Sequence, residues 1–251
     1  MIIKKNNFQI REIRKSCKLA AECLHYIEPK IVPGITTNEL NDILSSFIKQ
    51  KGAISAPLGY NGYPKETCIS VNEVICHGIP SERILLEGDI VNIDVTVILD
   101  GYFGDTSKTF PVGNINQDAS DLLSVTKKCL DIGIESVCPN APFNYIGNSI
   151  TKFIKNTNYS IVDKFVGHGC GIKFHEDPKI CHYVDEKFKD FGPKMEPGMI
   201  FTIEPMINMG APDCIILEDN WTAITVDNKL SAQFEHMILC TNSGYEILTV
   251  L

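Results

Sequence analysis

The sequence has no Cys-x-x-Cys pair, no dense cluster of Lys and Arg, and no uncharged apolar run of about 18 residues. The ten cysteines are scattered, so we expect free thiols rather than a disulfide framework. A net charge of −8 argues against nucleic acid as a partner. Because the N-terminal segment has no apolar leader and no segment could span a membrane, we expect a cytoplasmic protein.

What the sequence does contain is enough apolar material for a sizeable core. Hydrophobic residues make up 44% of the 251 positions and charged residues 22%, which excludes wholesale disorder. No segment rich in Pro, Ser and Gly divides the chain. We therefore expect a single domain over residues 1–251.

Four stretches have apolar residues three and four positions apart, which predicts amphipathic helices over residues 10–27, 37–51, 122–132 and 146–154. Thr36 with Glu39 predicts a capping box at the start of the second helix, and Gly52 predicts its end. Runs of β-branched residues broken by Gly and Pro predict strands over residues 68–80, 88–99 and 101–113.

The two halves of the chain show the same order of features. In each half, two predicted helices are followed by strand-like segments. A glycine also precedes an acid by six positions in each half, as Gly88 and Asp94 and as Gly198 and Glu204. This predicts a duplicated helix–helix–sheet unit that brings one acid from each half to a common centre. Chance similarity is the alternative.

Two acids of the first half need an explanation. Asp94 shares a strand face with Asn92 and Thr96, and a carboxylate in so apolar a strand is costly unless it is paired, hydrogen-bonded or bound to a metal. A buried salt bridge is the alternative for Asp94. Taken alone, Asp105 is more simply interpreted as a turn residue or a helix N-cap.

Two acids of the second half complete the set. Glu204 closes a predicted strand before Pro205, and Glu235 lies inside an apolar run. None of the four runs contains a Lys or Arg to pair with its acid, so the acids and several imidazoles together predict a metal cage. Carboxylate-rich ligation favours Mn, Fe or Co over a thiolate zinc site. Two bridging carboxylates can hold two ions roughly 3.5–4 Å apart.

The segment 165–178 carries two histidines. Gly167, Gly169 and Gly171 make a helix unfavourable there. In a continuous strand, a spacing of seven would point the rings of His168 and His175 to opposite faces. The two imidazoles are therefore expected to have different roles.

Several of these segments resemble type I methionine aminopeptidases, from the first helix to the last strand. The motifs that carry the resemblance are "CHGIP", "NIDVTV", "GYFGDTSKTF", "GHGCGIKFHEDP", "FTIEP" and "SAQFEHMI". The resemblance implies an α+β fold of the pita-bread (creatinase/aminopeptidase) type, in which two pseudo-symmetric halves surround a curved antiparallel sheet. It also implies hydrolytic removal of the initiator methionine from nascent proteins whose second residue is small.

Position by position, the resemblance assigns residues to roles. The implied ligands of two divalent metal ions (Co, Mn, Fe or Zn) are Asp94, Asp105, His168, Glu204 and Glu235. The implied catalytic residues are His77 and His175, which would contact the substrate, and Glu204, which would shuttle protons. The methionine side chain would lie among Tyr60, Tyr63, Cys68, Phe174 and Trp221. Taken singly, Cys68 and Phe174 are more simply interpreted as core residues.

The implied partners are the N-termini of nascent polypeptides, with docking on the ribosome left open and a monomer expected. The zinc-binding extension of eukaryotic cytosolic relatives and the long insert of type II enzymes are both missing, so a bacterial or organellar type is expected. Two positions depart from the family pattern. Pro57 replaces a cysteine that many relatives carry near the pocket, and Asn220 replaces a glycine.

Two other functions are compatible with a fold of this type. A proline-directed peptidase of the same fold, such as prolidase or aminopeptidase P, is expected to carry an additional N-terminal domain, for which there is no room before Ile10. A metal-free protein of this fold that only binds partners is expected to lack at least one ligand acid. All five ligand positions are filled, which favours the enzyme.

Overall fold

The computed structural model describes residues 1–251, with four α-helices, three short 3₁₀ helices and fifteen strands. The α-helices are α1 (Asn7–Ile27), α2 (Thr37–Gln50), α3 (Gln117–Glu135) and α4 (Asn144–Ile154). The 3₁₀ helices are η1 (Glu28–Lys30), η2 (Tyr60–Gly62) and η3 (Glu186–Phe188). All four predicted α-helices are confirmed, with boundaries that differ by a few residues.

The start of α2 has the predicted capping box. The Thr36 hydroxyl accepts the backbone N–H of Glu39 at 3.1 Å, and the Glu39 carboxylate accepts the backbone N–H of Thr36 at 2.8 Å. Asn6 and Gln9 form a similar box at the start of α1. Each cap satisfies backbone donors that the helix cannot, which contributes about 1 kcal/mol per helix. Gly52 follows α2 with a φ of +74°, as its predicted end requires.

All the strand pairs are antiparallel. One sheet contains β1 (Ile54–Ser55), β4 (Ile90–Leu99), β2 (Cys68–Val71) and β5 (Tyr102–Pro111). The longest path is β15 (Gly244–Ile247), β14 (His236–Thr241), β9 (Ile200–Ile203), β7 (Gly167–Gly169) and β8 (Glu176–Ile180). Two smaller sheets contain β13 (Ser231–Gln233), β10 (Met206–Asn208) and β6 (Ser160–Ile161), and β11 (Cys214–Ile216), β12 (Ala223–Thr225) and β3 (Val74–Cys76). The predicted strands are confirmed, and the segment 68–80 forms two of them, β2 and β3.

The predicted duplication is visible in the packing. One hydrophobic core joins α1 and α2 to β2, β4 and β5, and a second joins α3 and α4 to β9 and β14. Gly88, with a φ of +93°, lies two residues before β4, and Gly198, with a φ of +90°, lies two residues before β9. Because only glycine adopts such angles without strain, the matching glycines make the same turn into the strand that leads to Asp94 or Glu204.

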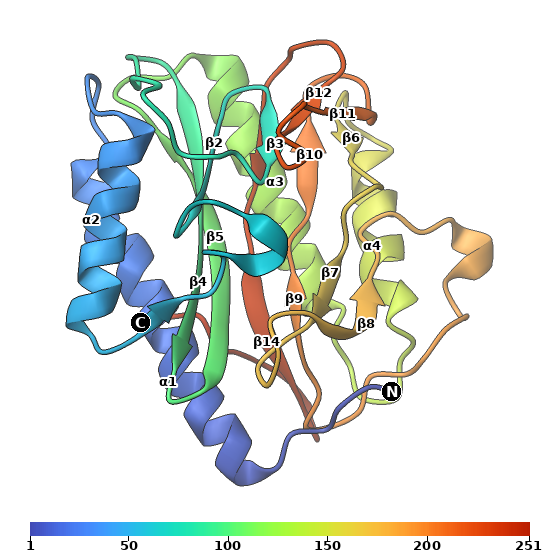
Figure 1. Cartoon of the computed structure of the whole chain (residues 1–251). Helices are drawn as coiled ribbons and strands as arrows, with labels where there is room; N and C mark the ends of the chain where they lie inside the picture. Colours follow the sequence, from blue (N-terminus) through green and yellow to red (C-terminus); the bar gives the residue numbers. More distant parts are fainter.

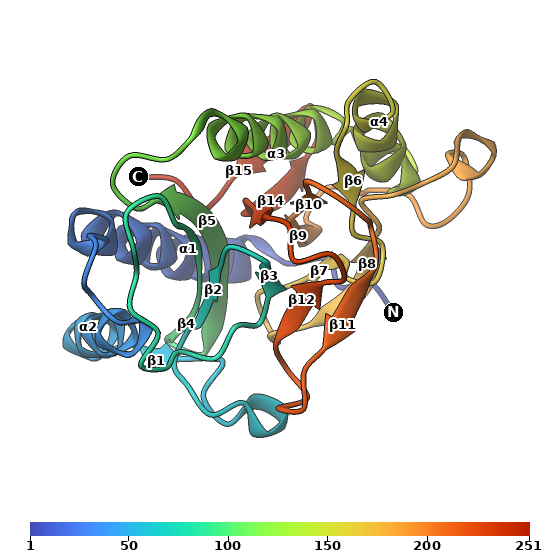
Figure 2. The ribbon, with the colours of Figure 1, turned by 90° about the horizontal axis from the view of Figure 1, so that it is seen from above.

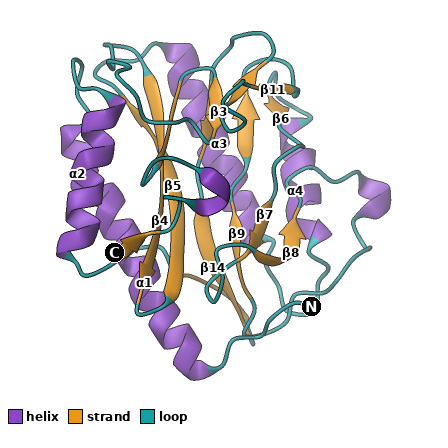
Figure 3. Ribbon diagram, in the orientation of Figure 1, coloured by secondary structure: helices purple, strands orange, loops and turns teal.

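Helices and strands lie in separate layers. In Figure 2, α1 and α2 lie together at one side of the strands, and α3 and α4 lie along another. The long strands β4, β5, β9 and β14 run through the middle of the molecule, as Figures 1 and 3 show. The η2 segment and the β11–β12 hairpin lie on the side of the strands away from α3 (Figure 2). The helices thus support one face of the strands, and irregular segments gather on the other.

All ten cysteines are free, as expected from their spacing. None of the helices combines the length and the apolar character needed to cross a membrane.

Candidate active site

A cavity of about 700 Å³ opens among these irregular segments, and its lining comes from both halves of the chain. All twelve residues that the sequence predicted for the site line this cavity: Tyr60, Tyr63, Cys68, His77, Asp94, Asp105, His168, Phe174, His175, Glu204, Trp221 and Glu235. The structure therefore brings the whole predicted set together, although its members span most of the sequence.

Asp105 lies in the middle of β5, not at a turn or a helix start. Its position in the β4–β5 ladder is opposite Thr96, and the Thr96 hydroxyl donates to Oδ1 of Asp105 at 2.7 Å. The interpretation of Asp105 as a turn residue or an N-cap is therefore wrong. Alternation in a strand had already placed Thr96 on the same face as Asp94, which explains how two neighbouring strands present both acids to one cavity.

Asp94, Asp105 and Glu235 form one group of acids. A carboxylate oxygen from each lies within 4.8 Å of the other two. Asp94 comes from β4, and Glu235 comes from the junction of β13 and β14. The nitrogen-bearing side chain nearest to Asp105 is that of His168, and no Lys or Arg pairs with Asp94, Asp105 or Glu235. The alternative of a buried salt bridge for Asp94 is therefore wrong.

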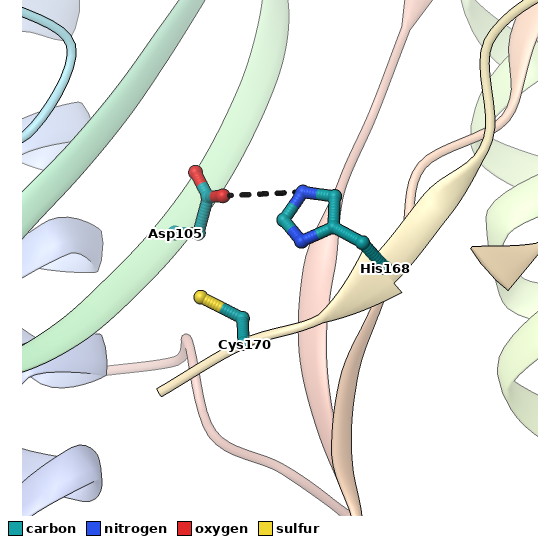
Figure 4. A group of neighbouring side chains, drawn as sticks. All are labelled: Asp105, His168 and Cys170. Atoms are coloured by element: carbon teal, nitrogen blue, oxygen red, sulfur yellow. Dashed lines mark ion pairs between the residues drawn. The ribbon is translucent and has the colours of Figure 1, made fainter. Parts of the chain in front are cut away.

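His168 faces two of the acids from β7. Its Nδ1 lies 3.0 Å from the backbone oxygen of Gly169, which can only accept, so Nδ1 carries the proton. The lone pair on Nε2 then faces Oδ2 of Asp105 at 3.7 Å, as Figure 4 shows, and Oε1 of Glu204 at 3.6 Å. Burial lowers the pKa of His168 to about 3, so the imidazole is neutral and these contacts are not salt bridges at neutral pH.

Glu204 follows the end of β9 and is held on several sides. Oε1 accepts the Thr202 hydroxyl at 2.6 Å, and Oε2 accepts the Gln233 amide at 3.3 Å. The Glu204 backbone N–H, which has no strand partner there, donates to Nε2 of buried His182 at 3.1 Å. Thr202, Gln233 and His182 were not predicted from the sequence. Thr202 and Gln233 each lie two residues before a predicted acid, where strand alternation places a side chain on the same face.

The acids of the cavity repel one another. Burial and the neighbouring carboxylates raise the pKa values of Asp94, Glu204 and Glu235 well above the usual range, and burial raises that of Asp105 to about 7. Four buried carboxylates without a cationic side chain, facing a neutral imidazole lone pair, form an electron-rich site. This donor set fits divalent cations, which would relieve the repulsion.

Cys170 is a further side chain beside the cage that the sequence analysis left unassigned. Its sulfur, an Asp105 oxygen and a ring nitrogen of His168 lie within 4.8 Å of one another (Figure 4). Burial and Asp105 raise the pKa of the Cys170 thiol well above its usual range, so the thiol is neutral. Cys170 belongs to a small apolar cluster with Cys17 and Met237, which closes the site on the side of α1.

The two histidines of segment 165–178 are close neighbours. The expectation for a continuous strand, with rings on opposite faces, is wrong, because a loop separates β7 from β8 and the chain reverses within it. The ring centroids of His168 and His175 lie 4.2 Å apart as a result. His168 is half-buried among the acids, and His175 is exposed to the cavity. Burial also lowers the pKa of His175, so both rings are neutral at pH 7.

His77 has a strained backbone. Its φ of 56° lies in the left-handed region, which is uncommon for residues other than glycine, and such a conformation persists where the surroundings enforce it. The next residue, Gly78, has no room for a side chain, since a Cβ would lie 2.3 Å from the Ile69 carbonyl oxygen. The His77 ring packs edge-on against Phe165 and Trp221. Burial lowers its pKa to about 4, so this imidazole is neutral too.

Aromatic rings line the cavity in two groups. Tyr63 packs edge-on against Trp221, with centroids 5.1 Å apart, and its hydroxyl donates to the carbonyl oxygen of Gly78 at 2.9 Å. The ring centroid of Tyr60 lies 4.8 Å from that of Phe174 and 5.1 Å from that of His175. Cys68 is paired with Asp94 in the β2–β4 ladder, which places an apolar thiol next to the acids.

The two departures from the family pattern occupy different places. Pro57 lines the cavity, where it presents a rigid ring in place of a thiol. Asn220 has a φ of +64° in the turn before Trp221. This left-handed conformation explains the usual glycine, and asparagine is among the side chains that tolerate it best. The substitution at position 220 therefore leaves the turn intact.

The comparisons with known proteins agree with this geometry. The model of metallopeptidase family M24 matches residues 11–242. Methionine aminopeptidase A of Synechocystis is 51% identical over 243 residues, which cover 96% of this chain and 95% of that protein. A crystal structure of methionine aminopeptidase from Rickettsia prowazekii superposes with a TM-score of 0.97 at 45% identity and covers both chains completely. A prolidase from Pyrococcus furiosus is only 21% identical, with a TM-score of 0.80, over 99% of this chain and 66% of that one.

The chain belongs to metallopeptidase family M24. Within it, curated relatives at 44–51% identity carry the name methionine aminopeptidase, which confirms the resemblance and the prediction of a metal-dependent aminopeptidase. The pita-bread fold is confirmed by the same structural neighbours. The similarity to prolidase shows the shared fold alone, so the rival activity gains no support from it. The binding-only alternative is wrong, since the family and its relatives are peptidases.

Proposed function

We propose that this chain removes the N-terminal methionine from nascent polypeptides whose second residue is small, and that residues 1–251 act as one catalytic domain. The observation that carries the proposal is the convergence of four carboxylates and the free lone pair of His168 in one cavity, without a cationic side chain among them. An exopeptidase of this family needs such a cage beside an apolar pocket, and the aromatic rings lie immediately next to it.

Five residues would hold two divalent ions: Asp94, Asp105, His168, Glu204 and Glu235. Asp105 lies close to both Asp94 and Glu235, and His168 approaches both Asp105 and Glu204, so the five donors form one connected group. When bound, the ions supply Lewis acidity to the scissile carbonyl and lower the pKa of water in the site. Membership of the metallopeptidase family implies the use of a divalent metal. That two ions bind, and that they are Co, Mn, Fe or Zn, is part of the proposal.

The protein's own groups have three tasks in the reaction. Glu204 takes a proton from the attacking water and returns it to the leaving amine. Each of its oxygens accepts one hydrogen bond, Oε1 from Thr202 and Oε2 from Gln233, and keeps a further lone pair for this role. His175 is neutral and faces the cavity, so it can donate a hydrogen bond to the carbonyl oxygen as negative charge develops there. His77 is held next to the aromatic wall, where it contacts the bound residue.

The methionine side chain would lie between the two aromatic groups, against Tyr60, Tyr63, Cys68, Phe174 and Trp221. Aromatic edges and a neutral thiol attract a polarizable thioether. The free α-amine of the substrate would bind at the cage through its lone pair, which formylation removes. The expected setting is the cytoplasm, with a monomeric enzyme that meets polypeptides at or near the ribosome.

The proposal is tested by measuring the release of methionine from Met-Gly and Met-Ala peptides in the presence of Mn, Fe, Co or Zn. Peptides that begin with Leu, X-Pro peptides and formyl-Met peptides serve as controls. We expect turnover of the two Met peptides alone. Turnover of X-Pro peptides without release of methionine would support the prolidase alternative instead, and cleavage of formyl-Met peptides at similar rates would contradict the role of the free amine.

A further inference from the structure

Lys5 and Glu176 form an ion pair that is almost completely buried. Nζ of Lys5 lies 2.7 Å from Oε2 of Glu176, and the side chains are 1% and 2% exposed. Removing two charges from water offsets most of their attraction, so a buried pair is weak evidence for stability. Lys5 does not line the cavity, and Glu176 lines it without being one of the predicted metal ligands or substrate-binding residues. The pair therefore calls for a role other than stability, and its position in the fold suggests one.

The second oxygen of Glu176 organises the loop between β7 and β8. Oε1 accepts the backbone N–H groups of Ile172 and Lys173, each at 2.8 Å. The carboxylate thereby closes the chain from residue 172 to residue 176 on itself. Phe174 and His175, which line the cavity, lie inside this closed segment. Their positions depend on where the Glu176 carboxylate is held.

Lys5 connects the Glu176 carboxylate to β9, the strand that leads to Glu204. The backbone N–H of Lys5 donates to the carbonyl oxygen of Gly198 at 2.8 Å, and Nζ also approaches the carbonyl oxygen of Ile200 at 3.5 Å. Ile200 begins β9, and Glu204 follows the end of that strand. A continuous series of contacts thus runs from β9 through Lys5 and Glu176 to the loop that carries His175.

We propose that Lys5 and Glu176 are positioning residues, which hold His175 and Phe174 at a fixed distance from Glu204 across the substrate pocket. The inference rests on the proposed function, because it gives the placement of His175 a purpose. Both oxygens of Glu176 are already engaged, by Lys5 and by the two backbone N–H groups, so the pair acts through the loop 172–175. A misplaced hydrogen-bond donor loses most of its effect on a developing oxyanion, so the pair should control kcat.

The test compares Lys5→Met with Lys4→Met. Lys4 precedes Lys5 and also forms an ion pair, with Glu196. The side chains of Lys4 and Glu196 are both exposed, and the pair does not include a residue of the loop. At metal saturation, and well below the melting temperature, we expect Lys5→Met to lower kcat by about tenfold or more, within the roughly 10²–10³ that one oxyanion donor supplies. Lys4→Met should match the unsubstituted enzyme. Metal affinity measured by calorimetry should be unchanged in both.

Two further measurements separate positioning from general stability. In a His175→Ala background, Lys5→Met should lower kcat little further, because the group it positions is gone. The amides of Ile172 and Lys173 should exchange hydrogen faster in Lys5→Met, while exchange at Gly169 stays the same. Should Lys5→Met fail to fold, Glu176→Gln carries the test, since glutamine keeps an acceptor for the two N–H groups and loses the charge that holds Lys5.

The inference is overturned if kcat is unchanged in Lys5→Met, if its loss is equally large without His175, or if metal affinity falls in parallel with kcat. If the unsubstituted enzyme releases no methionine in any metal, the proposed function fails instead. The exchange rates of the loop amides would still report whether Lys5 orders the loop.

Discussion

The hydroxyl of Thr202 connects His168 to Glu204. It accepts the backbone N–H of His168 at 2.9 Å and lies 2.6 Å from Oε1 of Glu204. A hydroxyl has a single proton, and the backbone N–H can only donate, so the Thr202 proton goes to the carboxylate. One fully buried side chain thereby sets the relative position of two predicted metal ligands on neighbouring strands.

Thr202→Val is expected to weaken metal binding and lower kcat by about tenfold each. Valine has nearly the same shape, but it leaves a buried N–H and a carboxylate oxygen without their partner, at a cost of about 1–3 kcal/mol. Calorimetric titration with metal and turnover of a Met-Ala peptide measure the two effects. Thr202→Ser, which keeps the hydroxyl, should restore both. A serine variant as impaired as the valine variant would show that packing, not the hydrogen bond, matters.

His168 and His175 should respond differently to replacement by alanine. His168→Ala should lower metal affinity and leave the metal-saturated enzyme badly impaired, because the cage loses its one imidazole. His175→Ala should bind metal normally and still lose roughly 10²–10³ in kcat, the usual effect of one oxyanion donor. Titration of metal into each variant by calorimetry, followed by turnover at saturation, distinguishes the roles. The reverse pattern would mean that the two roles have been exchanged.

Removal of metal should abolish activity and leave the protein folded. No residue of the two large hydrophobic cores lines the cavity, so the fold should not depend on bound ions. Metal should nevertheless raise the melting temperature, because the cage acids repel one another without it. Circular dichroism and scanning calorimetry before and after chelation measure both effects. Activity that survives chelation, with metal content near zero by elemental analysis, would contradict a metal mechanism.

The contribution of Asp105 to the stability of the metal-free protein should be lost as pH rises from about 4 to about 7. Burial raises the pKa of Asp105 from 3.8 to about 7, so the folded protein binds a proton that the unfolded chain has already lost. This contribution is complete below the unfolded pKa and disappears as pH passes through about 7. The buried histidines, whose pKa values are lowered, act in the opposite direction near pH 6.5, because the unfolded chain binds protons there that the folded protein does not. The Asp105→Asn variant keeps these histidines, so the difference in melting temperature between the chelated protein and the variant isolates the contribution of Asp105. This difference should change as pH rises through about 7, and a difference independent of pH would contradict the prediction.

Local patterns in the sequence predicted the elements of the fold well, because caps and periodicity depend on neighbouring residues. The capping box of Thr36 and Glu39 and the matching Gly88 and Gly198 are examples. The closeness of His168 and His175 was not predictable in this way. It depends on a reversal between β7 and β8, and the sequence pattern there does not distinguish a continuous strand from a hairpin with a loop.

In the candidate site, too, some residues can be recognised from the sequence and others only from the folded structure. The five predicted ligands are acids and a histidine in apolar or glycine-rich surroundings, and such residues stand out in a sequence. The residues that hydrogen-bond to Glu204 do not stand out in the sequence. Thr202, His182 and Gln233 are ordinary residue types in buried strands and loops. The partners they find come from distant segments, as in the contact between His182 and the Glu204 backbone. Only the folded chain identifies them.

The distribution of the cage donors along the chain determines when, during its synthesis, a new copy of the enzyme can become active. Asp94 and Asp105 come from the first half, and His168, Glu204 and Glu235 come from the second. A polypeptide still being translated has no complete cage until nearly all of it has left the exit tunnel. Each new copy therefore becomes a catalyst only at the end of its synthesis.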